Sequence, residues 1–135
     1  MSDGIPAGFV ALPPRGGDFF DANGPVYLRH DGDDMTLGFR LELRHCNPLR
    51  VAHGGMLVAM VDDLMGRVIW QLGKRAATVS LTCDFLSAAR LGAWVEVRCR
   101  PTQVTPSLIF MRGEVSVEGE TVLTASGVWK LLGAT

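Results

Sequence analysis

The amino-acid sequence predicts an α+β fold in which one long central helix is wrapped by a curved antiparallel sheet. Three observations support this prediction. Apolar and polar residues alternate from residue 35 to residue 44, with the period of a half-buried strand. Residues 54–72 form an apolar run without proline that ends at Gly73-Lys74, as a buried helix does. Strand-like runs then follow at residues 77–88, 93–105, 107–119 and 121–132.

The rest of the chain fits a single unit. At 135 residues it has the length of one domain, so we expect residues 1–135 to share one core. Residues 1–23 are rich in proline and glycine, and they predict a loop or a short helix that packs its aromatic side chains on the body. Residues 25–30, which precede a turn-forming DGDD segment, predict a strand that enters the alternating strand as a hairpin.

Composition and charge exclude several classes of protein. With 47% hydrophobic residues, 20% charged residues and a formal net charge of −1, the chain is neither disordered nor suited to attract nucleic acid or an anionic membrane. Charged residues interrupt the apolar helix, so neither arm approaches the roughly 20 residues that a bilayer requires. The N-terminus does not resemble a secretory signal, and Cys46, Cys83 and Cys99 lack metal-ligand spacing. We therefore expect a cytoplasmic protein with reduced thiols and no metal site.

Two aspartates lie in the middle of the apolar helix. Helix neighbours are three and four positions apart, so Asp63 has Arg67 one turn ahead, in the favourable acid-before-base order. Asp62 has only small or apolar helix neighbours. An unpaired buried carboxylate costs several kcal/mol unless it is protonated or meets donors from elsewhere. Asp62 is therefore a candidate for acid–base or nucleophilic chemistry, and the alternative is a simple hydrogen bond to an amide or a hydroxyl group.

The start of the helix offers a second chemical group. His53-Gly54-Gly55 opens the helix, where the first N–H groups lack intrahelical partners and the dipole is positive, so an oxyanion or a polarised carbonyl oxygen can be held there. Asp62 follows His53 by nine residues, which in a regular helix is about 13 Å of rise and places the two on opposite sides. Two antiparallel chains can bring them together. We therefore expect an isologous homodimer with two shared sites.

The segment RHCNPLRVAHGGMLVAMVDDLMG, with GPVYLR before it and VSLTCDFLSAARLG after it, resembles the phenylacetate-pathway (PaaI-like) type of hotdog-fold acyl-CoA thioesterases. The resemblance covers residues 24–132. It includes the order of elements, the asparagine, the HGG helix start and the aspartate nine positions after the histidine. One position departs from the family pattern, because Arg50 stands where a glycine is common, three positions after the asparagine.

This resemblance implies hydrolysis of an acyl-CoA thioester without a further cofactor, since coenzyme A is part of the substrate. In the family, the asparagine positions substrate or water, the amide of the first glycine polarises the thioester carbonyl, and an acidic residue of the partner subunit acts as base or nucleophile. Carried over, these roles fall on Asn47, on Gly54 supported by His53, and on Asp62. An assisting serine of some members corresponds to Ser80. The family also implies a dimer of dimers.

Further expectations concern the substrate. The candidates for binding the CoA phosphates, chosen by charge and loop position, are Arg50, Lys74, Arg75 and Arg90. Apolar side chains of the helix suggest an aromatic or medium-chain acyl group. The helix residues that we expect primarily in the core are Met56, Leu57, Met60 and Trp70.

Two other functions compete with hydrolysis. A hotdog hydratase or dehydratase would also bind an acyl thioester, but the spacing from Asn47 to the HGG motif speaks against it. A non-catalytic protein that binds acyl-CoA is the alternative from a different class. The complete set of asparagine, glycine and aspartate disfavours this alternative, whereas the departure at Arg50 leaves it open.

Overall fold

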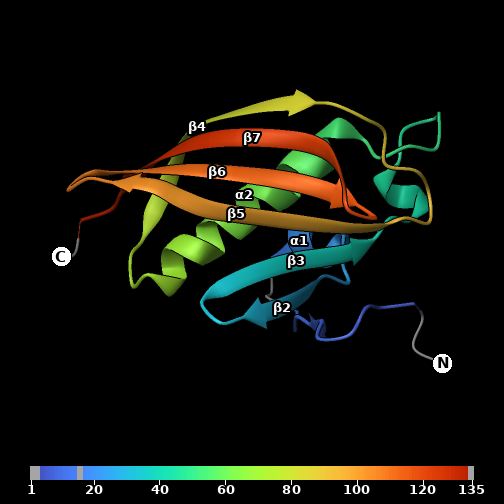
Figure 1. The fold of residues 1–135 in the computed structure, drawn as a ribbon, viewed down its shortest axis with the longest axis horizontal. Helices are drawn as coiled ribbons and strands as arrows, with labels where there is room; N and C mark the ends of the chain where they lie inside the picture. Colours follow the sequence, from blue (N-terminus) through green and yellow to red (C-terminus); the bar gives the residue numbers. More distant parts are fainter. Residues whose placement is uncertain (1–3, 15–16, 134–135) are drawn as a thin grey trace.

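A computed structural model describes residues 4–14 and 17–133. One long helix, α2, lies in the curve of a seven-stranded sheet (Figure 1). The helices are α1 (Asp18–Ala22), the 3-10 helix η1 (Leu43–His45) and α2 (Gly54–Gln71). The strands are β1 (Val10–Ala11), β2 (Tyr27–Asp31), β3 (Asp34–Arg40), β4 (Ala76–Phe85), β5 (Trp94–Val104), β6 (Leu108–Val117) and β7 (Glu120–Leu131). The predicted α+β fold, with a central helix wrapped by an antiparallel sheet, is confirmed.

The sheet is antiparallel throughout, in the order β1-β2-β3-β5-β6-β7-β4. Strands β5, β6 and β7 follow one another through short turns and form the middle of the sheet in front of α2 (Figure 1). The connection through α2 carries the chain from β3 to β4, which pairs with β7 and lies at one edge. An edge strand leaves backbone N–H and C=O groups unpaired, so β4 is a place where another chain can add.

Helix α2 supplies the centre of the core. Met60, Val61, Leu64 and Met65 are each 0% exposed, because this face of the helix is covered by the sheet. The sheet meets it with buried apolar side chains, among them Leu37, Phe39, Val95, Val97, Ile109, Met111 and Leu123. Each such side chain contributes about 1.5–3 kcal/mol by its removal from water, so this contact dominates the stability of the fold. In the described part of the chain, no helix is both long enough and apolar enough to cross a membrane.

The prediction that Trp70 belongs to the core is wrong. Its side chain is 68% exposed, whereas Met56, Leu57 and Met60 are buried as expected. At about 100° per residue, Trp70 lies on the side of α2 opposite Val61. The sheet covers only one side of the helix in this chain, so the apolar character of the other side needs a different explanation.

The strand predicted up to residue 44 ends earlier, since β3 stops at Arg40. Leu43 continues the alternating pattern but begins η1 and is 58% exposed. A capping box causes the change: the N–H of Glu42 donates to His45 Nδ1, and the Glu42 carboxylate accepts from the His45 N–H. This local competition for backbone hydrogen bonds favours a turn over a longer strand.

His45 fixes the segment between β3 and α2. Its side chain is buried, with Nδ1 accepting from the Glu42 N–H and Nε2 lying 2.9 Å from the carbonyl oxygen of Asn23. Its carbonyl oxygen accepts from the N–H of His53 at 2.9 Å, which ties this segment to the start of α2. Burial lowers the pKa of His45 below its ordinary value of 6.5, against a smaller opposing effect of the Asn23 carbonyl. The neutral ring is therefore the form that the fold holds.

We predict that mild acid destabilises the fold through His45. Because its pKa is lower in the folded chain, the unfolded chain takes up the proton first as the pH falls below about 6.5. The contribution is fully present above that pH and is lost as the pH falls towards the lowered folded value. The urea midpoint should therefore drop between about pH 7.5 and about pH 5, and His45→Gln should reduce this drop. His30→Gln, at an exposed histidine, is the control, and an equal pH dependence in all three proteins would contradict the assignment.

Candidate active site

A short loop carries Asn47 to the start of α2. Cys46 and Ala52 form an antiparallel bridge across the loop, and the N–H of Asn47 donates to the carbonyl of Val51 at 2.9 Å. The side-chain Oδ1 of Asn47 accepts from the N–H of Leu49 at 3.0 Å. The oxygen of this half-buried side chain is thus used by its own loop, and its Nδ2 group remains as a donor for a substrate or a water molecule.

The same loop places Arg50 in the left-handed region of backbone conformation, with φ at 62°. A non-glycine residue costs about 1–2 kcal/mol there, which gives a physical reason for the glycine that the resembled family often has at this position. The Arg50 carbonyl accepts from the N–H of Leu91 at 3.0 Å, and Val51 bridges Arg90. The exposed Arg50 and Arg90 therefore arise from adjoining backbone beside the start of α2.

Helix α2 begins with a backbone donor that no described residue uses. His53 is the N-cap, and its Nδ1 accepts from the Gly55 N–H at 2.9 Å. The hydrogen bonds formed among the described residues include none from the N–H of Gly54. A Cβ at residue 54 would lie 3.1 Å from Phe85 Cε1, so glycine allows the end of β4 to lie against the helix start. An unused N–H at a positive helix end is suited to an oxyanion.

Asp62 lies on the side of α2 that meets β4. Its Oδ1 accepts a hydrogen bond of 2.8 Å from Thr78 Oγ1. Its Oδ2 receives no hydrogen bond from a described residue, so one oxygen of this half-buried carboxylate is oriented and the other can act on a proton or a carbonyl carbon. Asp63 pairs with Arg67 at 2.8 Å, as predicted.

Ser80 does not share the position of Thr78 beside Asp62. A β-bulge at Val79 shifts the register, so that Thr78 pairs with Trp129 whereas Ser80 pairs with Val128. Paired residues on neighbouring strands point to the same face of a sheet, and successive residues of one strand point to opposite faces. The buried Trp129 faces the helix, so its partner Thr78 does too. Val128 points the other way, so its partner Ser80 faces outward. Regular alternation would put Thr78 and Ser80 on the same face. The structure therefore adds Thr78 to the candidate site. The sequence did not predict this, because no residue type in the segment indicates a β-bulge.

A groove of about 650 Å³ runs along the side of α2 that the sheet leaves open. Asp62 lies at one end of the helical part of its wall, followed one turn later by Gly66 and two turns later by Trp70. The remaining wall residues lie on α2, β2 and β3. They are Leu28, His30, Met35, Asp63, Arg67 and Gln71. Such a volume is typical of a small-molecule site.

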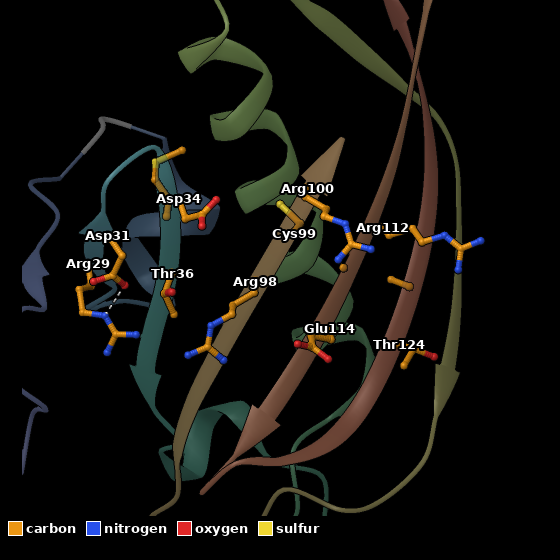
Figure 2. Close-up of a pocket in the computed structure, with 13 residues that line it drawn as sticks. Arg29, Asp31, Asp34, Thr36, Arg98, Cys99, Arg100, Arg112, Glu114 and Thr124 are labelled. Carbon is orange, nitrogen blue, oxygen red and sulfur yellow. Dashed lines mark hydrogen bonds and ion pairs between the residues drawn. The ribbon is translucent and has the colours of Figure 1, made fainter. Parts of the chain in front are cut away.

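A second hollow, of about 480 Å³, is lined mainly by charged side chains of the sheet (Figure 2). Two of its arginines are held in ion pairs, Arg29 with Asp31 and Arg98 with Glu96. Cys99 also lines it, and burial raises the pKa of this thiol to about 12, so the thiol stays protonated and unreactive. None of the predicted site residues lines this hollow, so we exclude it from the candidate active site.

Within one chain, the predicted residues form separate groups. Asn47, Arg50, His53, Gly54 and Arg90 gather at the start of α2, and Asp62 lies on the same helix about 12 Å further along. Lys74 and Arg75 follow the other end of α2, which is 18 residues or about 27 Å long, so they lie far from the other two basic candidates.

Comparison with known proteins shows the family. Residues 49–124 match the model of the thioesterase superfamily. The chain is 30% identical over 131 residues to a candidate esterase of Pseudomonas aeruginosa, and the match covers 94% of this chain and 97% of the other.

Solved structures show the same fold. A variant of the phenylacetic acid degradation protein PaaI from Thermus thermophilus is 25% identical, with a TM-score of 0.78, and the match covers 86% of this chain and 100% of that one. A Streptococcus pneumoniae protein described as a hypothetical thioesterase, solved with coenzyme A, is 19% identical, with a TM-score of 0.80 and coverage of 86% and 92%. The resemblance to PaaI-like hotdog thioesterases is thus confirmed, and the chain belongs to the thioesterase superfamily as a thioester hydrolase.

Proposed function

We propose that this chain hydrolyses acyl-CoA thioesters at two sites shared across a homodimer. Each site combines Asp62 of one protomer with Gly54 and Asn47 of the other. The observation that carries the proposal is the presence of two complementary groups on one rigid helix: an unused N–H at Gly54 and a carboxylate at Asp62 oriented by Thr78. About 12 Å of helix separates them, so they cannot act on one thioester carbonyl within a single chain.

An exposed strand edge supports the dimer. Strand β4 is ten residues long, pairs with β7 on one side and carries both Thr78 and the exposed Val79. A long edge with an apolar side chain is a favourable place for another strand to add. Addition of a second β4 by a two-fold axis would also set two α2 helices antiparallel. The dimer of dimers expected from the family remains a further proposal.

The mechanism follows from the charges that develop during hydrolysis. The Gly54 N–H donates to the thioester oxygen as it becomes an oxyanion, an effect worth about 3–4 kcal/mol per donor in other enzymes. Asp62 either takes a proton from an attacking water, or attacks the carbonyl carbon itself to form a mixed anhydride that water then hydrolyses to the free acid and the Asp62 carboxylate. In both routes the C–S bond breaks and CoA leaves as a thiolate, which takes a proton from Asp62 in the first route and from water in the second. Thr78 holds the carboxylate in position, and Asn47 Nδ2 can position the substrate or the water. His53 supports the site by accepting from Gly55 instead of Gly54.

Coenzyme A is the expected leaving group. The Streptococcus pneumoniae relative is solved with coenzyme A. In two alanine variants of that protein, the replaced residues are an aspartate and a threonine whose positions differ by 16, the separation of Asp62 and Thr78 here. The adjoining Arg50 and Arg90 are our candidates for the CoA phosphates, whereas Lys74 and Arg75 can contribute only from the far end of the helix. We expect this activity in the cytoplasm.

We predict that Asp62→Asn lowers kcat at least about 100-fold, because the amide can neither accept the proton nor attack. The assay is thiol release from short, medium and aromatic acyl-CoA esters by the folded protein. Thr78→Val should also lower kcat, since the carboxylate loses its donor, while Ser80→Ala should have the smaller effect. Equal turnover by wild type and Asp62→Asn would refute the role of Asp62, whereas ester binding without turnover would indicate a binding protein.

The oxyanion donor can be removed without removing the helix start. We predict that Gly54→Pro lowers kcat by about 100-fold or more, because proline lacks the N–H. Proline is compatible with the first helical position, and the extended His53, with φ at −61° and ψ at 128°, is compatible with a following proline. Gly54→Ala keeps the N–H and places the same Cβ against Phe85. An equal loss in both variants would assign the effect to crowding and refute the role of the donor.

Mixing two inactive variants tests whether the site is shared. In a dimer of one Asp62→Asn chain and one Gly54→Pro chain, one site loses both groups and the other keeps both. Random exchange of subunits should therefore restore about one quarter of the wild-type activity. Activity is measured after the two proteins are unfolded and refolded together, with each protein refolded alone as control. A failure to recover activity, despite formation of mixed dimers, would place the complete site within one chain.

A further inference from the structure

The groove along α2 contains a glycine that packing within the chain does not explain. Gly66 lies in the middle of α2, where glycine is the least favourable residue after proline. A Cβ at this position would lie 3.5 Å from Trp129 Cη2, which is an ordinary van der Waals contact. Alanine would therefore fit against the sheet and favour the helix. Gly66 also lines the groove.

The neighbours of Gly66 on the same side of α2 define what this groove can hold. Asp62 lies one turn before Gly66, and Trp70 lies one turn after it with 68% of its surface exposed. The rise of a helix places Gly66 about 6 Å and Trp70 about 12 Å from Asp62 along the axis. A chain or ring attached to a carbonyl at Asp62 can thus lie over Gly66 and end against the indole, with Leu28 and Met35 on the opposite wall.

We propose that this groove holds the acyl group of the thioester and that Gly66 and Trp70 determine which acyl groups are accepted. This rests on the proposed function, in which the carbonyl lies at Asp62. Gly66 leaves the space that the middle of the acyl group occupies. Trp70 supplies an apolar surface for the far end. The accepted class is an acyl group of medium length or with a ring, since an acetyl group does not extend over Gly66.

The size of residue 66 is the direct test. A Cβ at this position would already be in van der Waals contact with Trp129, so we expect a side chain larger than alanine to extend over the groove instead. Gly66→Leu should lower kcat/KM for octanoyl-CoA and phenylacetyl-CoA at least about tenfold, and should change the value for acetyl-CoA less than about threefold. Gly66→Ala is the matched control, because alanine and leucine have similar helix propensities and differ in volume.

The exposed aromatic surface has its own test. Trp70→Ala should lower kcat/KM for the same two large esters by about tenfold and should lower the value for acetyl-CoA by a much smaller factor. Leu72→Ala is the control, because Leu72 is an exposed apolar residue next to the end of α2 that does not line the groove. Both variants remove an exposed apolar side chain, so a difference between their kcat/KM values for the large esters is an effect of the groove.

The outcomes separate this inference from the function on which it rests. Hydrolysis of every ester by wild type, with the same ratio of large to small esters in Gly66→Leu and Trp70→Ala, would overturn the role of the groove and retain the thioesterase. A uniform loss on all esters, together with dissociation to monomers in light scattering, would assign the groove to subunit contact and overturn the inference. Absence of thiol release from any ester by wild type would refute both proposals. A selective loss on the large esters in dimeric variants supports the inference.

Discussion

The packing of one face of α2 into the curved sheet is the constraint on which the rest of the molecule depends. Met60, Val61, Leu64 and Met65 have no contact with solvent, so the rotation of the helix is fixed. That rotation places Asp62 beside β4, where Thr78 can reach it. It also leaves the opposite side of the helix uncovered in this chain. A helix held by such a contact is a rigid support, and the positions of its polar groups follow from its 1.5 Å rise per residue.

Much of this arrangement could be predicted, because it depends on local and periodic signals. The change from strand to helix follows from the period of the apolar residues along the sequence, which is two residues in β3 and nearly four in α2. The ion pair of Asp63 with Arg67 follows from helix geometry alone. The HGG motif indicated the helix start, and the structure adds the reason why Gly54 and not Gly55 has a donor to offer: the His53 ring accepts from Gly55.

The features that could not be predicted depend on contacts between distant segments. The bulge at Val79 changes which hydroxyl of β4 faces Asp62, and a single extra residue in a strand leaves no mark in the composition. Trp70 looks like a core residue by its type, but no strand in the described part of the chain covers its side of the helix. The early end of β3 depends on a hydrogen bond between Glu42 and His45, which competes with a strand that the pattern alone would extend.

A rigid helix that carries a donor at one end and a carboxylate near its middle also connects catalysis to assembly. Within one chain, Gly54 and Asp62 are separated by about 12 Å, so each isolated protomer would contain two half-sites and no complete site. A thioester bound between two protomers, as proposed, would contact both, and it would stabilise the dimer by mass action, increasingly as its concentration exceeds its Kd. Under this proposal, dilution that separates the protomers would remove activity, and substrate would oppose that separation. In the proposed shared site, the stiffness of a helix that cannot bring its two groups to one carbonyl would make the dimer the smallest unit able to complete the reaction.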